Sequence, residues 1–151
     1  MTPDEILKEI QEAFRDVIRP EKFIRGTCSC DECMEHNQTL ATHTPDNITM
    51  NELGNPGWDP MCFANDQAFA YYLPALVRLA FEEDAYGDQL LFHLNSPGRL
   101  EILNDRQTRA ILDALWLLVD TQAVEIKRNL DYYSLEEAIK KLEQRLSDKP
   151  R

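Results

Sequence analysis

Three cysteines and a histidine lie within nine residues in the first third of the chain. They read Cys28-x-Cys30-x2-Cys33-x2-His36, and Cys62 follows beyond a loop. Thiolate sulfur and imidazole nitrogen are the ligands that zinc prefers in proteins. We therefore expect a zinc site in which Cys30, Cys33 and His36 are the core ligands. Either Cys28 or Cys62 would then complete a tetrahedral site.

The same cluster has two other interpretations. Cys30 and Cys33 form a Cys-x2-Cys pair, a spacing also found in thiol redox proteins. A reactive thiol needs positive surroundings, whereas Asp31, Glu32 and Glu35 make these surroundings negative. Alternatively the cysteines are plain core residues, because a free cysteine packs as a small hydrophobe. One face of a helix through this segment would hold Cys30, Cys33, Met34, Asn37, Leu40 and Ala41.

The rest of the sequence offers little catalytic chemistry. It has no Gly-rich phosphate loop, no nucleophile elbow and no Glu-x2-His pair for a di-iron site. A Cys–His nucleophilic pair would require Cys62 to meet His43 or His93 in space. Trp58 lies in a loop rich in proline and glycine, and we expect it to be exposed as an interaction anchor. The sequence therefore favours a non-catalytic protein over an enzyme.

Hydrophobic periodicity predicts helices from end to end. Thr2 and Glu5 form a capping box at the first helix, and Arg19-Pro20 ends it. Ser29 with Glu32 predicts the cap of a second, short helix that runs to about residue 41. Cys30, Cys33 and His36 would then lie on this second helix.

The second half of the chain contains the most apolar helices. Residues 65–83 are apolar on nearly every side and predict a central helix, which Pro74 either kinks or splits. Asn104 with Gln107 predicts the cap of a long helix. Residues 131–148 predict a C-terminal amphipathic helix, with Ser134 and Glu137 as its capping box. Its apolar face holds Leu135, Ala138, Ile139, Leu142 and Leu146.

The fold class follows from this helical pattern. No segment shows the sustained alternation of a strand, so we predict an all-α protein. The length of 151 residues indicates a single domain, 1–151. We expect a single compact bundle of five to seven helices with orthogonal or irregular packing.

The charge of the chain limits the classes of molecule that we expect it to bind. The net charge is −11, and all of the excess negative charge lies in residues 1–123. A surface of this kind repels nucleic acid and anionic membranes, whereas it suits a basic protein partner. The N-terminus lacks the features of a signal peptide and no stretch is apolar enough to span a bilayer, so we expect a cytoplasmic protein.

Five landmarks occur in an order that resembles a known family. They are Ala13-Phe14, Arg19-Pro20, Cys30-x2-Cys33-x2-His36, Phe69-x-Tyr71-x-Leu73-Pro74 and Gln107-x2-Ala110. The resemblance is to an uncharacterised family of small bacterial helical proteins, a domain of unknown function. It covers residues 5–120 and leaves the last helix outside. It implies a compact helical domain in the bacterial cytosol, and no activity.

Together these observations predict a small acidic protein-interaction module of the immunity or antitoxin kind. The alternatives are a zinc-binding protein that uses the Cys28-Cys30-Cys33-His36 cluster, and a thiol redox protein. The apolar face of the C-terminal helix also permits a homodimer through that helix.

Overall fold

The computed structural model describes residues 1–83, 86–128 and 132–147. In these ranges the chain forms seven α-helices, three short 3-10 helices and an isolated antiparallel bridge between Ile24 and Ala64, with no strand. The predicted all-α fold class is confirmed. The helices are α1 (Pro3–Ala13), α2 (Asp31–Ala41), α3 (Met50–Leu53), α4 (Asp66–Glu82), α5 (Tyr86–Asn95), α6 (Asp105–Arg128) and α7 (Tyr132–Ser147). The 3-10 helices are η1 (Pro56–Trp58), η2 (Pro60–Cys62) and η3 (Arg99–Ile102).

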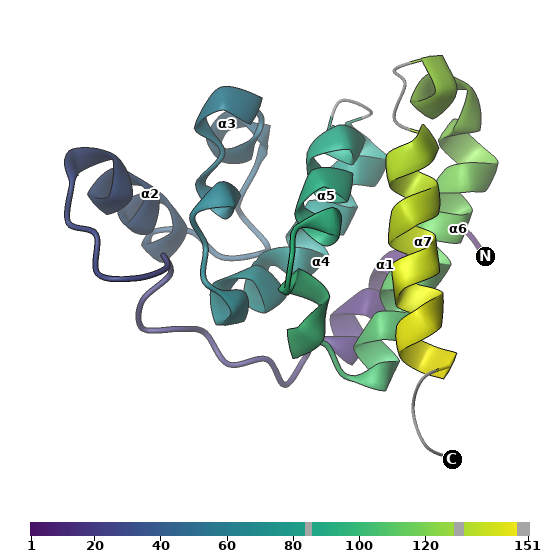
Figure 1. The fold of residues 1–151 in the computed structure, drawn as a ribbon, viewed down its shortest axis with the longest axis horizontal. Coiled ribbons are helices and arrows are strands. Elements are labelled where there is room, and N and C mark those ends of the chain that lie inside the picture. Colours follow the sequence, from purple (N-terminus) through teal and green to yellow (C-terminus); the bar gives the residue numbers. More distant parts are fainter. Residues whose placement is uncertain (84–85, 129–131, 148–151) are drawn as a thin grey trace.

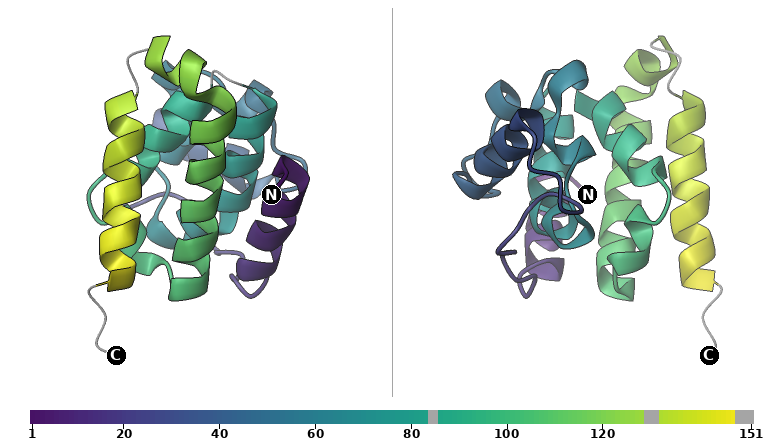
Figure 2. Two further views of the ribbon diagram at one scale, coloured as in Figure 1. Left: turned by 90° about the vertical axis from the view of Figure 1, so that its right-hand side faces the viewer. Right: turned by 60° about the vertical axis from the view of Figure 1, so that its left-hand side comes forward.

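The helices divide the molecule into a bundle and a cysteine-bearing end. α6 packs between α1 and α7 on one side of the molecule (Figure 2). α4 and α5 lie in the middle, and α2 forms the opposite end (Figure 1). α4 is the central helix because it is apolar on most sides, as the sequence predicted. Among the described residues, no helix is both long and apolar enough to cross a membrane.

The first helix begins where it was predicted and ends earlier. Thr2 and Glu5 form the expected capping box, but α1 stops at Ala13. Ile18, which was expected on its apolar stripe, is 75% exposed. The chain turns away because Arg19 reaches toward α2, where its guanidinium donates to carbonyl oxygens at the C-terminal end of that helix. Arg19 thus ties α1 to the cysteine-bearing end.

Pro74 neither splits α4 nor ends it, since the helix is continuous through it. The predicted cap of α6 is present: Gln107 donates its backbone N–H to the side chain of Asn104 at 2.8 Å.

The predicted Ser134 cap of the last helix is wrong, because α7 already includes Tyr132. Residues 131 and 148, the predicted limits of this helix, lie outside the described residues.

The apolar face of α7 packs within the chain. Leu135, Ala138, Ile139 and Leu142 are buried against the bundle, where α7 contacts α5 and α6. This face is therefore occupied by the protein's own core. A homodimer through α7 stays a prediction, and it would have to use the other face of the helix.

Candidate metal centre

Two distant segments meet at the cysteine-bearing end. The backbone N–H of Arg25 donates to Phe63 at 2.8 Å, and that of Asn65 donates to Phe23 at 2.8 Å. This short pairing fixes residues 23–25 beside residues 63–65. Gly26 follows with a φ of +67°, a conformation that favours glycine, and turns the chain into the cysteine segment. Both cysteine-bearing loops are therefore anchored by the same backbone bridge.

The three thiols of Cys28, Cys30 and Cys33 lie together. Their Sγ atoms are all within 4.8 Å of one another, and those of Cys28 and Cys30 are 3.2 Å apart. Cys30 is the N-cap of α2, and its Sγ accepts the backbone N–H of Cys33 at 3.5 Å. The predicted cap, Ser29, is wrong by one residue, because the residue with extended backbone just before the helix is Cys30. The positive end of the helix dipole therefore faces the sulfur atoms, which favours thiolate.

The three thiols differ in exposure and in proton affinity. Cys28 and Cys30 are exposed, whereas Cys33 is buried. Hydrogen bonds from Cys33 and Cys30 lower the pKa of Cys28, although the charge of Glu32 opposes the shift. The hydrogen bonds that Cys33 makes to its two neighbours raise its own pKa to about 12. The cluster thus holds protons between its sulfur atoms, in the place where a metal ion would replace them.

The packed-core interpretation applies to only one of these cysteines. The buried side chains of α2 are Cys33, His36 and Leu40. Met34, which was expected on the same buried face, is 54% exposed. The helix is rotated from the predicted face because His36 takes the central position.

His36 lies in an aromatic stack, outside the group of three thiols. Its ring faces Phe63 with 4.5 Å between centroids and 19° between planes, and Trp58 lies 4.6 Å away on a tilt. Both ring nitrogens are buried and have no hydrogen-bond partner among the described residues. Glu32 is the nearest charge, with its carboxylate 3.6 Å from Nε2. The assignment of His36 as a zinc ligand stays a prediction.

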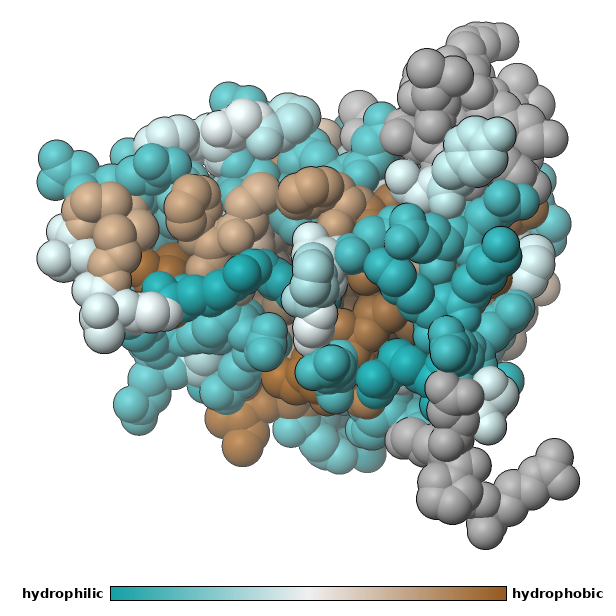
Figure 3. Space-filling view, in the orientation of Figure 1, coloured by the Kyte–Doolittle hydropathy of each residue, from teal (hydrophilic) through white to brown (hydrophobic). Residues whose placement is uncertain are grey.

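Trp58 belongs to η1 and is 39% exposed. Its ring packs against the ring of His36. In Figure 3, a band of moderately hydrophobic surface runs from the end that carries α2, at the left of the view, toward the middle of the molecule. The role of Trp58 as an interaction anchor stays a prediction.

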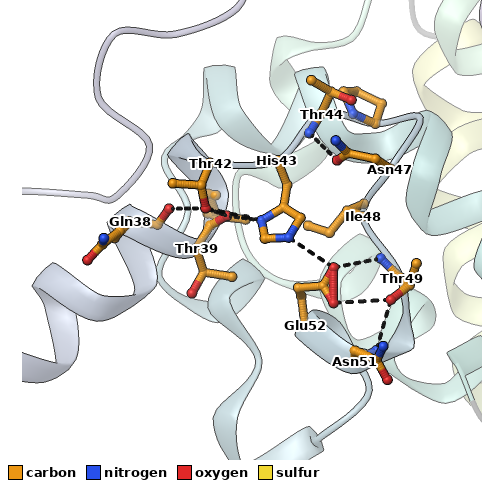
Figure 4. Close-up of polar contacts among 12 residues, drawn as sticks. Gln38, Thr39, Thr42, His43, Thr44, Asn47, Ile48, Thr49, Asn51 and Glu52 are labelled. Atoms are coloured by element: carbon orange, nitrogen blue, oxygen red, sulfur yellow. Dashed lines mark hydrogen bonds and ion pairs between the residues drawn. The ribbon is translucent and has the colours of Figure 1, made fainter.

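His43 belongs to a structural network. Its Nδ1 donates to the Thr39 carbonyl at 2.7 Å, and its Nε2 pairs with the Glu52 carboxylate at 3.1 Å (Figure 4). Glu52 also forms the capping box of α3 with Thr49. His43 thereby links the end of α2 to α3, and it does not join the group that contains Cys62.

Cys62 lies away from the other cysteines, in a second group with Asp59 and His93. Sequence reasoning considered Cys62 and His93 as a pair and missed Asp59. Asp59 precedes Pro60, and its Oδ1 accepts the backbone N–H of Met61 at 2.9 Å. In the sequence, Asp59 has the pattern of a helix cap, and no neighbouring residue predicts its contact with His93 of α5.

The fold and the thiol cluster define this protein as a small all-α protein with a candidate thiolate metal centre. The chain belongs to the DUF6714 family, a family of unknown function, whose model matches residues 2–144. The resemblance drawn from the sequence is thereby confirmed. The match extends beyond residue 120 into α7, which packs on the bundle as part of the same fold. No curated protein matches the chain, and no solved structure matches it.

Proposed function

We propose that this protein binds a thiophilic metal ion, zinc in the first place, through Cys28, Cys30 and Cys33. The observation that carries the proposal is the convergence of three sulfur atoms within 4.8 Å, from a loop and the first turn of α2. Sulfur atoms bound to one zinc ion at about 2.3 Å are roughly 3.8 Å apart in a tetrahedral site. The Cys28 and Cys30 sulfur atoms are 3.2 Å apart and all three lie within 4.8 Å of one another, so a metal ion needs only small movements of the side chains.

The local electrostatics favour a cation. Asp31, Glu32 and Glu35 surround the thiols with negative charge, which a bound cation would offset. The N-terminus of α2 and the N–H of Cys33 stabilise the Cys30 sulfur as a thiolate ligand. Three thiolates and one zinc ion leave a single negative charge at the site.

A three-thiolate site of this kind keeps a coordination position open. Cys28 and Cys30 are exposed, so the fourth position faces solvent. A structural zinc site is closed by four protein ligands, whereas an open position accepts water or a group from another molecule. We infer a site that exchanges its metal or a fourth ligand in preference to one that only stabilises the fold.

The experiment is metal analysis of the protein purified without chelator. Cys30→Ser is expected to lose one equivalent of zinc relative to the unaltered protein. Ser29→Ala is the matched control, since it changes the residue between two ligands and leaves all thiols in place. Zinc content that is equal in all three proteins would exclude the site. A Cys28–Cys30 disulfide in the freshly purified protein would instead favour the thiol redox alternative.

A second proposal concerns protein interaction. We propose that the acidic body, with a net charge of −11, docks a basic protein partner as an immunity or antitoxin-like module does. The half-exposed Trp58 supports a contact at this end, because tryptophan is enriched at interface hot spots. A pull-down at low and at high salt tests it, with Trp58→Ser as the variant. A partner retained equally at both salt concentrations would contradict electrostatic docking.

A further inference from the structure

A second cluster of ligand-type side chains lies between η2 and α5. α5 directs Tyr86, Gln89 and His93 from one face, at spacings of three and four residues, toward the loop that holds Asp59 and Cys62. Asp59 and His93 are 34 residues apart in sequence. None of these side chains takes part in the thiol cluster described above.

Asp59 and His93 form a buried, oriented pair. Asp59 is 2% exposed and His93 is 1% exposed, and Nε2 of His93 lies 2.8 Å from Oδ2 of Asp59. Gln89 donates its amide to the same carboxylate oxygen at 3.0 Å, while the other oxygen accepts the N–H of Met61. Partners of this kind fix the orientation of metal-binding carboxylates and imidazoles in known sites.

Cys62 brings a thiol to this pair from the solvent side. Its Sγ lies within 4.8 Å of the donor atoms of both Asp59 and His93, and the residue is exposed. The cluster therefore reaches the surface of the protein at Cys62.

A buried hydroxyl at the same place has no partner. Tyr86 is fully buried, and its hydroxyl makes no hydrogen bond to any described residue. Burial, followed by the charges of Asp59 and Cys62, raises its pKa well above the usual range. The hydroxyl is therefore near both groups, and an unpaired buried polar atom is costly unless something binds there.

We propose that Asp59, Cys62 and His93 bind a second divalent transition-metal ion of the zinc class. Carboxylate oxygen, thiolate sulfur and imidazole nitrogen form a donor set that zinc accepts. Ligand atoms at zinc bond lengths lie roughly 3.3–3.8 Å apart in a tetrahedral site. The 2.8 Å between Oδ2 of Asp59 and Nε2 of His93 must open by roughly half an ångström for both atoms to bind one ion.

The charge balance of this site includes Arg99. Its guanidinium is buried, donates to the Met61 carbonyl at 3.0 Å and so holds η2 in place. Its positive charge opposes a cation near Cys62, and the thiolate and carboxylate offset this with two negative charges. One divalent ion would balance the charges of the Asp59 carboxylate and the Cys62 thiolate, while Arg99 and Arg25, whose guanidinium donates to the Cys62 carbonyl at 3.4 Å, add positive charge nearby.

The test uses a variant in which Cys62 is the last thiol. The chain has four cysteines, so Cys28→Ser, Cys30→Ser and Cys33→Ser together remove the first site and leave the second intact. Titration of this variant with Co²⁺ under anaerobic conditions is expected to show one ion per chain and a thiolate-to-cobalt charge-transfer band. Adding Cys62→Ser should abolish the band, and adding His93→Asn should weaken binding by at least tenfold. Ile18→Ala, at an exposed position outside the cluster, is the control.

A folded triple variant that gives no charge-transfer band at saturating Co²⁺ would overturn the proposal, as would a band that His93→Asn leaves unchanged. If the triple variant does not fold, alkylation of Cys62 in the otherwise unaltered protein decides the matter. Added Zn²⁺ should slow alkylation of Cys62 in the unaltered protein and not in His93→Asn, and equal slowing or none in both would refute the site. Cleavage at the acidic residues between Cys33 and Cys62 places Cys62 in a peptide apart from the other three cysteines, so failure here is distinguishable from failure of the Cys28–Cys30–Cys33 site.

Discussion

The imidazole of His36 lies nearly parallel to the ring of Phe63, 4.5 Å from it. This contact joins the middle of α2 to the chain just after η2. Since aromatic packing of this kind is favourable by about 0.5–1.5 kcal/mol beyond the buried area, it holds α2 in place independently of any metal. The thiols at the start of α2 are therefore positioned by the protein core and are ready for a ligand.

The role of His36 can be separated from that of the cysteines by substitution. His36→Phe keeps the stack and removes two buried nitrogens that have no hydrogen-bond partner among the described residues, at the cost of the 3.6 Å contact with Glu32, so we expect an equal or higher free energy of unfolding. His36→Ala leaves a cavity and should lower it by about 3 kcal/mol. Urea denaturation measures both changes. Zinc content should be unchanged in His36→Phe, and a loss of one equivalent would instead identify His36 as a ligand.

Zinc should stabilise the folded protein by mass action. At a free zinc concentration 100 times the dissociation constant, one site contributes about 2.7 kcal/mol. For a chain of this size, the thermal midpoint should rise by roughly 5–10 °C. Differential scanning calorimetry with and without zinc measures the shift. Cys30→Ser should show a smaller shift than the unaltered protein, and an identical one would mean that the stabilising ion binds elsewhere.

The accuracy of the sequence-based predictions depended on how local each feature is. The capping boxes at Thr2 and Asn104 were predicted because their partners lie three residues away. The pair Ser29 and Glu32 has the pattern of a capping box, but the extended residue before the helix is Cys30, which only the backbone conformation shows. The cysteine cluster was found because its members are adjacent in sequence.

The parts that were missed depend on contacts over long sequence separations. His36 stacks on Trp58 and Phe63, which follow it by more than twenty residues. Asp59 meets His93 across 34 residues, through helices that pack in the folded core. Helical periodicity predicts which side chains face the core, but it does not predict which of them contact one another in the folded protein. A ligand group assembled from separate elements is therefore beyond what one sequence predicts.

The three clustered thiols should differ in reactivity when no metal is bound. Cys28 is exposed and its pKa is lowered, so it should react first with iodoacetamide. Cys33 is buried with a pKa of about 12 and should react slowest of the three. Peptide mass spectrometry over a time course at pH 7.5 gives the three rates. Faster reaction of Cys33 than of Cys28 would contradict the hydrogen bonds that lower the pKa of Cys28 and raise that of Cys33. Added Zn²⁺ should suppress alkylation of both cysteines.

The stability of the fold should decline in strong alkali because of Tyr72. Its hydroxyl lies within hydrogen-bond distance of the Leu40 and His43 carbonyls. Burial, against the opposing charge of Arg19, raises its pKa from 10.0 to about 12. Between these values the unfolded chain releases the tyrosine proton and the folded chain keeps it, so unfolding is favoured as the pH rises.

Tyr72→Phe should remove this part of the pH dependence. At neutral pH the variant should lose about 1–2 kcal/mol, because a buried hydrogen bond between α4 and the end of α2 is lost. From pH 10 to pH 12 its free energy of unfolding should fall less steeply than that of the unaltered protein. Urea denaturation across this range measures both slopes, with Tyr133→Phe at an exposed position as the control. Parallel slopes in Tyr72→Phe and the unaltered protein would mean that Tyr72 ionises at the same pH in the folded and unfolded states, and that burial at the contact between α4 and α2 does not hold its proton.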